Sequence, residues 1–280
     1  MMYIGRSIFQ TSVSDCLSET FTALKYEAEK GDPKAQFDLA ECYFYGDGIE
    51  EDDDEAIRWF TKAAEQGYME AQLQLIHCYY DGDGAEKNIE EAVRWMKAAA
   101  ANGNMTAQTT LGCRYMNGDE VELDYEEAVK WFTKAAEQDD TVSQYNLGVC
   151  YLEGFGVEKD AEKAVGWFRR SAGHGDAVAY CALGNCYFEG QGVERSEEEA
   201  VRWYRIAAEK GDWEAQKNLG DCYLYGYGVE KNFMQAVDWY SKAAEQGNEE
   251  AIKFLEEHLP KNGLTIVYSL VKQKNGGKRG

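Results

Sequence analysis

The stretch GDWEAQKNLGDCYLYGYGVEKNFMQAVDWYSKAAEQ, residues 211–246, decides the fold because its pattern occurs six times in the chain. Its Trp239 closes a series of tryptophans spaced 36 residues apart, at positions 59, 95, 131, 167, 203 and 239. Tyrosine, leucine and alanine recur with the same period at other positions, without insertion or deletion. A period of this length is typical of a solenoid, in which each unit packs only on its neighbours. The six units are 31–66, 67–102, 103–138, 139–174, 175–210 and 211–246.

Each unit contains two helical patterns separated by a glycine-rich turn. In the last unit, Leu219 and Tyr223 lie four residues apart on one face of a first helix. Gly226 follows where a left-handed C-cap is expected. Trp239 and Ala243 repeat the helical spacing after the turn, and the alanines of this second helix allow close helix packing. The sequence therefore predicts an all-α fold, a right-handed superhelical solenoid of helix-turn-helix repeats.

The paired glycines of the turn invite comparison with a phosphate-binding loop. Gly190 and Gly192 stand just before a predicted helix, as they would in such a loop. Glu194 stands two residues after Gly192, as a glutamate does after each of the five G-x-G turns, and its charge would repel a phosphate. We therefore expect turn residues rather than a nucleotide site. Glu120 replaces the second glycine in the third unit, and we expect its loop to take a different path.

Acidic and basic residues four positions apart occupy the predicted exposed face of four second helices. Such pairs stabilise an isolated helix by only about 0.2–0.5 kcal/mol each, so they are not expected to drive folding. The four pairs are Asp54–Arg58, Glu90–Arg94, Glu126–Lys130 and Glu198–Arg202.

Half-units flank the array. Residues 14–30 resemble a lone second helix and residues 247–259 a lone first helix, so both are predicted to cap the ends of the solenoid. Residues 1–13 form an N-terminal extension. Residues 260–280 form a basic tail that contains the apolar run LTIVYSLV (264–271). This run either folds back on the solenoid or docks a partner strand, and fold-back is favoured because an exposed run of this kind promotes aggregation.

The chain of 280 residues carries a formal charge of −22. Residues 260–280 contain five basic and no acidic side chains, so residues 1–259 carry −27. A body of this charge repels nucleic acid and anionic membrane surfaces and favours basic partners, although the charge would also serve solubility alone. The N-terminal residues lack the apolar run of a signal peptide, and no segment has the length of a membrane span. We therefore expect a cytoplasmic protein.

The residues that usually carry chemistry form no recognisable active site in the sequence. Five of the eight cysteines share one repeat position, so they lie apart along the solenoid and are predicted to be buried free thiols. No cysteine or histidine spacing is that of a zinc site. His77 is the one histidine at a predicted groove position, where a surface contact is favoured over catalysis. No catalytic triad, H-E-x-x-H or nucleophile elbow occurs, so we predict no enzyme, no metal and no cofactor.

The six units share the pattern A-x-x-x-L-G-x-x-Y-x-x-G-x-G-V-x-x-D/N-x-x-x-A-x-x-W-F/Y-x-x-A-A-x-x-G. This pattern closely resembles the SEL-one-like repeat (SLR), a relative of the tetratricopeptide repeat, over residues 31–246. The resemblance implies an adaptor that assembles complexes in signalling, protein quality control or contacts between bacteria and hosts. Some cysteine-rich bacterial members have a disulfide in each repeat and have been linked to β-lactam binding, so β-lactam binding or hydrolysis is a distant alternative. Those members need two cysteines per repeat, and this chain mostly has one.

Superhelical arrays bind partners along a concave face, which the first helices line. Aligning the units with the tetratricopeptide repeat through their shared Leu-Gly and Tyr positions predicts three groove positions per unit. Phe37, Leu73, Tyr145 and Val149 form an apolar path among them, unless these side chains only pack between adjacent first helices. The predicted groove residues are Lys34, Phe37, Glu41, Glu70, Leu73, His77, Thr106, Thr109, Cys113, Val142, Tyr145, Val149, Val178, Cys181, Asn185, Glu214, Lys217 and Asp221.

The acids at both ends of this path predict a peptide or protein partner with hydrophobic anchors and basic flanks. A protein–protein interaction scaffold is therefore the leading hypothesis. A structural or self-assembling protein is the alternative, because the end caps are imperfect and the C-terminal run is apolar.

Overall fold

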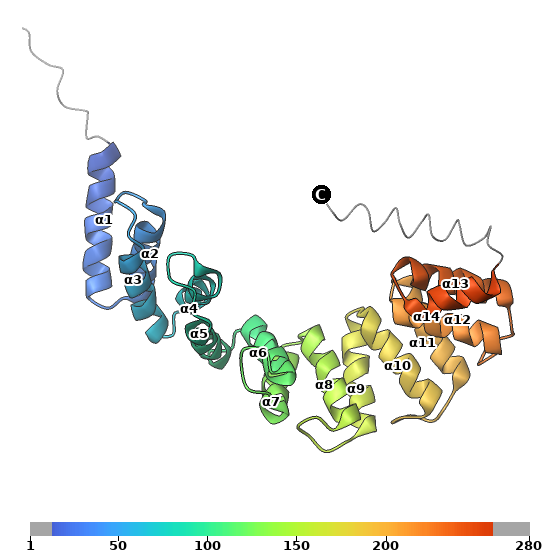
Figure 1. The fold of residues 1–280 in the computed structure, drawn as a ribbon. Helices are drawn as coiled ribbons and strands as arrows, with labels where there is room; N and C mark the ends of the chain where they lie inside the picture. The colour runs from blue at the N-terminus through green and yellow to red at the C-terminus, as the bar shows by residue number, and fades with distance from the viewer. Residues whose placement is uncertain (1–12, 260–280) are drawn as a thin grey trace, which may run out of the picture. The chain divides into compact units, whose positions relative to one another are not determined.

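The computed structural model describes residues 13–259, with side chains described from residue 21 onward (Figure 1). This part of the chain contains α-helices and one π-helical turn but no strand, which confirms the predicted all-α class. It divides into two compact units, of which the first ends at Asp124 and the second begins at Tyr125. The division falls between the two helices of the third predicted repeat. The basic tail and its apolar run lie outside the described residues.

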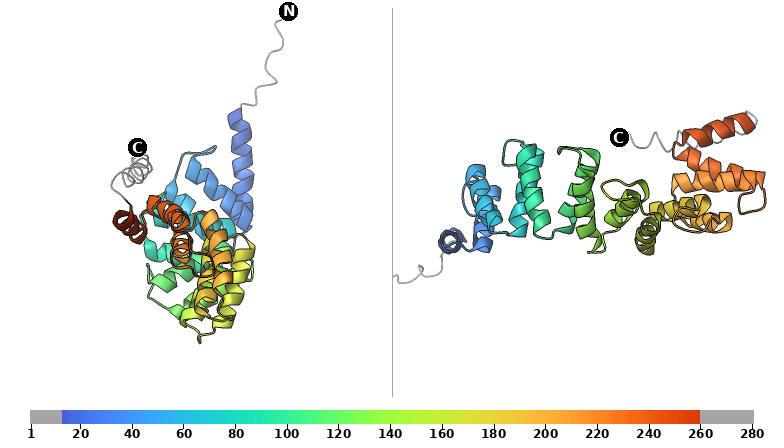
Figure 2. Two further views of the ribbon diagram at one scale, coloured as in Figure 1. Left: turned by 90° about the vertical axis from the view of Figure 1, so that its right-hand side faces the viewer. Right: turned by 90° about the horizontal axis from the view of Figure 1, so that it is seen from below.

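Helices follow one another in each unit as helix-turn-helix repeats. In the repeats that lie within one unit, the first helix packs on the second helix of its own repeat and on the second helix before it (Figure 2). The helices of the first unit are α1 (Val13–Glu29), α2 (Pro33–Tyr45), α3 (Asp53–Glu65), α4 (Met69–His77) with the π-helical turn Cys78–Gly82, α5 (Ile89–Ala101) and α6 (Met105–Asn117). Those of the second unit are α7 (Tyr125–Ala136), α8 (Thr141–Glu153), α9 (Ala161–Gly173), α10 (Ala177–Glu189), α11 (Glu197–Glu209), α12 (Trp213–Tyr225), α13 (Phe233–Glu245) and α14 (Glu249–His258).

Capping residues explain where the helices begin and end. The carboxylate of Asp52 accepts a hydrogen bond from the backbone N–H of Glu55 at 3.0 Å at the start of α3. An Asp, Asn or Ser takes the same role before α5, α9, α11 and α13. At the end of α12, Gly226 has φ 83° and its N–H donates to the carbonyl of Cys222, which confirms the predicted left-handed cap.

The second glycine of the turn is required by the preceding repeat in the last three repeats. A Cβ atom at Gly192 would lie 2.1 Å from the carbonyl oxygen of Ala161, the first residue of α9. A Cβ atom at Gly228 would lie 2.3 Å from the carbonyl oxygen of Glu197, the first residue of α11. The loop therefore rests on the start of the previous second helix, and the glycines are turn residues, as predicted.

The third loop corrects one expectation. Glu120 has φ 62°, in the left-handed region that glycine occupies in the other loops, so the backbone does not take a different path there. Its carboxylate pairs with the guanidinium of Arg114 and accepts a hydrogen bond from the hydroxyl of Tyr80 at 3.2 Å. Arg114 stands where the other repeats carry cysteine. The ion pair thus offsets a backbone conformation that costs a non-glycine residue about 1–2 kcal/mol.

The exposed ion pairs also differ from the predicted spacing, because each base contacts the glutamate three residues before it rather than the acid four residues before it. These glutamates are partly buried against the helix surface, whereas the acids one residue earlier are exposed. Residues three and four positions apart are both neighbours on a helix surface, and here the base contacts the partly buried acid. The observed pairs are Glu55–Arg58, Glu91–Arg94, Glu127–Lys130 and Glu199–Arg202, at 2.5–2.8 Å.

A buried glutamine links successive repeats. The side-chain amide of Gln216 on α12 donates to the carbonyl oxygen of Ala208 on α11 at 3.1 Å and accepts from the amide of Gln246 at 2.9 Å. Glutamines at 36, 72, 108 and 144 donate to the matching carbonyl of the preceding second helix. In the fifth repeat Tyr180 takes this place, and its ring stacks on Trp203 of the same repeat at 5.9 Å between centroids. A buried glutamine therefore joins the first four repeats and the sixth to the helix before them.

Candidate functional site

The predicted groove positions of the second unit lie on α8, α10 and α12. Val142 and Val178 are exposed, as an accessible face requires. Tyr145 is partly buried with its ring 5.7 Å from that of Phe168, so it packs within its own repeat. Cys181 is only 2% exposed, because it packs into the apolar cluster between α11 and α12, and its predicted place in the groove is wrong. The remaining positions are Val149, which is partly buried, Glu214, which is exposed, and Asn185, Lys217 and Asp221, which line the pocket described below.

In the first unit the predicted positions are a mixture of packing and surface residues. The ring of Phe37 lies 5.5 Å from that of Phe60, which supports the packing interpretation for this residue. Leu73 is 39% exposed. His77 makes a surface contact, with its Nδ1 atom 2.7 Å from the carboxylate of Asp81. Of the other positions, Lys34, Glu70 and Thr106 are exposed, and Glu41, Thr109 and Cys113 are partly buried. The apolar path draws on residues of both units and stays a prediction.

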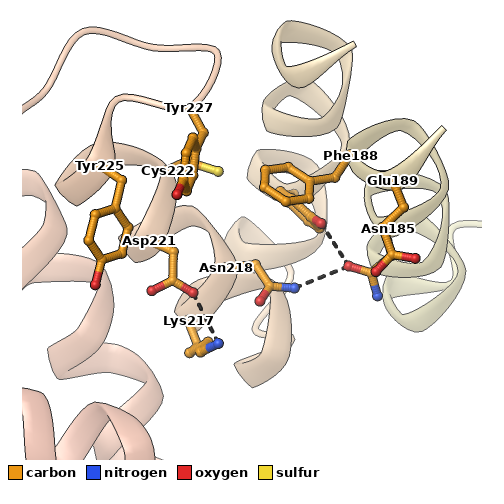
Figure 3. Close-up of a pocket in the computed structure, with 10 residues that line it drawn as sticks. Asn185, Phe188, Glu189, Lys217, Asn218, Asp221, Cys222, Tyr225 and Tyr227 are labelled. Atoms are coloured by element: carbon orange, nitrogen blue, oxygen red, sulfur yellow. Dashed lines mark hydrogen bonds and ion pairs between the residues drawn. The ribbon is translucent and has the colours of Figure 1, made fainter. Parts of the chain in front are cut away.

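A pocket of about 350 Å³ opens between the first helices α10 and α12 in the second unit (Figure 3). Three of the predicted groove residues, Asn185, Lys217 and Asp221, line it. Its other lining residues are Phe188, Glu189, Tyr204, Asn218, Cys222, Tyr225 and Tyr227. We take this pocket as the candidate site because it gathers both polar and aromatic side chains from successive repeats.

The floor of the pocket is an amide network centred on Asn185. Its Oδ1 atom accepts hydrogen bonds from the hydroxyl of Tyr204 at 2.7 Å and from the amide of Asn218 at 3.2 Å. Its amide donates to the carboxylate of Glu214 at 3.3 Å. Burial raises the pKa of Tyr204, so the hydroxyl stays protonated and remains a donor. The donor and acceptor assignment of Asn185 therefore follows from its neighbours on α11 and α12.

Lys217 is the one cation that lines the pocket, and acids of the chain already neutralise it. Its ammonium lies 3.0 Å from the carboxylate of Asp221 and 3.1 Å from that of Glu250. Burial alone would lower its pKa, but the hydrogen bonds and charges of these two acids outweigh burial and raise it above the usual value. Asp221 also accepts a hydrogen bond of 2.5 Å from the hydroxyl of Tyr240. This corner of the pocket is thus rigid and carries no surplus positive charge.

Aromatic rings form the rim. The ring of Tyr227 lies 5.4 Å from that of Phe188 and 5.6 Å from that of Tyr225, between centroids. Figure 3 shows Tyr225 and Tyr227 on the α12 side of the pocket and Phe188 with Glu189 on the α10 side. Tyr225 and Tyr227 are 54% and 37% exposed. Two large rings therefore face solvent beside a fixed polar floor, which is the composition of a recognition site for a side chain.

Sequence reasoning missed the rim, although a signal was present. The last unit has tyrosine at 225 and 227, where most other units carry acidic or amide residues in the turn. Tyr225 is the last residue of the first helix and Tyr227 lies in the turn, whereas the predicted groove positions lie earlier in the helix. A comparison of turn residues between units would have found both tyrosines.

Thiol and metal chemistry find no support in the described part of the chain. All seven described cysteines are free thiols. Cys78, Cys150, Cys186 and Cys222 are buried, as predicted, and Cys42 at the same repeat position is partly exposed. Burial raises the pKa of Cys222 to about 12, which removes the thiolate needed for nucleophilic chemistry. Among the described residues, no three His, Cys, Asp or Glu side chains are grouped to hold a metal ion.

Comparison with known proteins supports the same architecture. The model of the Sel1 repeat matches six times, at residues 33–68, 70–104, 106–140, 141–176, 177–212 and 213–248. The chain belongs to the Sel1 repeat family. Sel1 repeats generally serve as protein–protein interaction scaffolds, and the fold is typically non-catalytic. No curated protein matches the chain.

Two solved structures of Sel1-type proteins are similar to this chain. One is a protective antigen of uropathogenic Escherichia coli strains with an SLR fold, at 36% identity and TM-score 0.69. The match covers 91% of this chain and 56% of the antigen, so the chain spans little more than half of that protein. The other is a Sel1 repeat protein from Oxalobacter formigenes, at 34% identity and TM-score 0.65, with 79% and 96% of the two chains covered.

Within the described residues, no helix combines the length and the apolar character that crossing a membrane requires.

Proposed function

We propose that this Sel1 repeat protein is a non-catalytic scaffold that binds a peptide or protein segment on the first-helix face of its second unit. The observation that carries the proposal is the pocket between α10 and α12, where exposed aromatic rings stand beside a polar floor. Val178 adds exposed apolar area on α10. A partner with hydrophobic and basic residues suits this face, because the protein is strongly acidic. Nucleic acid is disfavoured for the same reason.

An affinity-purification experiment read by mass spectrometry tests the proposal. The wild-type chain is compared with a Tyr225→Ala/Tyr227→Ala variant, after circular dichroism shows that both are folded. Tyr45→Ala is the matched control, since Tyr45 holds the position of Tyr225 in the first repeat and is 65% exposed. We expect partners to be lost with the double variant and retained with the control.

The same partners with all three proteins would show that the pocket is not the binding site. If no partner is captured and light scattering shows a mass that rises with concentration, self-assembly replaces the scaffold as the function.

A further inference from the structure

We propose that the pocket between α10 and α12 recognises a cationic side chain, arginine or lysine, of the bound peptide. The inference rests on the proposed scaffold function and names the group that the pocket selects. It follows from three features: the charge around the pocket, the exposed rings and the way this chain uses its rings elsewhere.

The charged side chains that line the pocket are Glu189, Lys217 and Asp221, so the lining carries a net negative charge. Lys217 lies between two carboxylates, those of Asp221 and Glu250, so it contributes no surplus positive charge. Glu189 stands on the rim and forms no ion pair with any residue that the structure describes. Glu214 contacts the floor through Asn185. An incoming cation would therefore meet a net attraction, and an incoming carboxylate a repulsion.

The rings of the rim are available to a cation. Arg195 already lies over Phe188, with its guanidinium carbon 6.0 Å from the ring centroid, and is paired with Glu197 at 2.9 Å. Within residues 21–259, no cation lies over Tyr225 or Tyr227. Two exposed tyrosine faces beside an acid give a cation both a ring quadrupole and a counter-charge.

Elsewhere the chain supplies the cation itself. The ammonium of Lys242 lies 3.6 Å from the ring centroid of Trp239, and that of Lys62 lies 3.7 Å from that of Trp59. The tryptophans of five second helices are thus paired with an internal base. Among the described residues Tyr225 and Tyr227 have no such base, so their faces are open to a cation of a partner.

The test measures binding of defined peptides to the full chain by calorimetry. The probe is acetyl-Gly-Leu-Xaa-Leu-Gly-amide with arginine, lysine, citrulline or glutamate at Xaa. Citrulline keeps the shape of arginine and removes its charge. We expect the arginine peptide to bind about 3- to 30-fold more tightly than the citrulline peptide, the range that cation–π contacts give. The glutamate peptide should bind most weakly.

Variants assign the preference to the pocket. Tyr225→Leu/Tyr227→Leu should abolish the difference between arginine and citrulline, whereas Tyr225→Phe/Tyr227→Phe should retain it because the rings remain. Glu189→Gln should weaken only the arginine and lysine peptides, by about 2- to 5-fold at low salt. Glu153→Gln is the matched control, since Glu153 ends α8 as Glu189 ends α10, and it should change nothing.

The outcomes separate this inference from the proposed function. Equal affinity for the arginine and citrulline peptides overturns cation recognition and leaves the interaction face intact. Failure of the arginine peptide to bind at millimolar concentration overturns it as well, and partner capture that depends on Tyr225 and Tyr227 would still support the scaffold. A mass that rises with concentration, and falls in the leucine variant, would make a second copy the occupant and also overturn the inference.

Discussion

Replacing either of two glycines in the fourth repeat by alanine should change the free energy of unfolding, but in opposite directions. Gly148 lies in α8, where a Cβ atom would stand 2.4 Å from Cε1 and 2.5 Å from Cδ1 of Phe168. That ring is 1% exposed, so surrounding side chains hold it in place. Gly166 lies in the interior of α9, is exposed, and has no atom within 4 Å of a Cβ built there. The two substitutions therefore make the same chemical change in a closed and an open environment.

The expected magnitudes follow from two opposing effects. Replacing an interior helical glycine by alanine stabilises a helix by about 0.8–1 kcal/mol, and Gly166→Ala should raise the free energy of unfolding by about that amount. Overpacking a closed core costs about 1–3 kcal/mol, so Gly148→Ala should lower the free energy of unfolding by up to about 2 kcal/mol after the same helix gain is subtracted. With about 2–4 °C per kcal/mol for a chain of this size, the two melting temperatures should move apart by several degrees.

Urea unfolding followed by circular dichroism, together with thermal melts, measures the difference. Repeat arrays do not always unfold in one step, so amide hydrogen exchange in α8 and α9 should accompany the melts. Equal stabilisation by both substitutions would refute the reasoning that glycine is needed for the approach of α9. Ala40 holds the same place in the first repeat, whereas a Cβ atom at Gly184 in the fifth would lie 2.5 Å from the ring of Tyr204, so the requirement depends on how closely each second helix approaches.

Two other predictions concern the third loop and the buried thiols. Arg114→Cys should lower the free energy of unfolding by about 1–3 kcal/mol because it leaves Glu120 without its cation, and Glu120→Gly should cost less because glycine suits the left-handed backbone. The double variant restores the residues of the other repeats and should recover most of the loss, so additive losses in urea melts would contradict the coupling. Burial raises the pKa of the Cys150 thiol from 9.0 to about 11, so the folded thiol keeps its proton where the unfolded one ionises. Stability should therefore fall as the pH rises from about 9 to about 11, and Cys150→Ala should flatten that slope in pH-dependent melts; an unchanged slope would exclude this contribution.

Much of the fold was predictable because a 36-residue period repeats the same local physics six times. Each unit repeats the same helix-capping residues, turn glycines and apolar positions, so the helix boundaries predicted from one unit are supported by the others. The prediction for the third loop was wrong because Glu120 replaces the turn glycine there and Arg114 compensates for the replacement. Glu120 was expected to redirect its loop, and only the three-dimensional contact with Arg114 shows why the backbone is retained.

The candidate site was less predictable, because pocket formation depends on how successive repeats meet. Asn185, Lys217 and Asp221 were found from helix positions, since a helix face is fixed by spacing alone. Cys181 was misplaced because burial depends on how α11 and α12 cover it. The tyrosine rim was missed because Tyr225 ends its helix and Tyr227 lies in the turn, beyond the positions used to predict the groove.

The buried glutamine that five of the six repeats share has a consequence for how such a chain can change in evolution. Gln216 reaches back to a carbonyl of the preceding repeat and is held by Gln246 of its own. Every link of this kind joins one unit to its neighbour through a main-chain atom, which any sequence supplies. Whole 36-residue units can therefore be duplicated, deleted or exchanged without a new contact having to evolve between neighbouring repeats. Recombination can lengthen the array or exchange its recognition residues, while the contacts between neighbouring repeats are inherited unchanged.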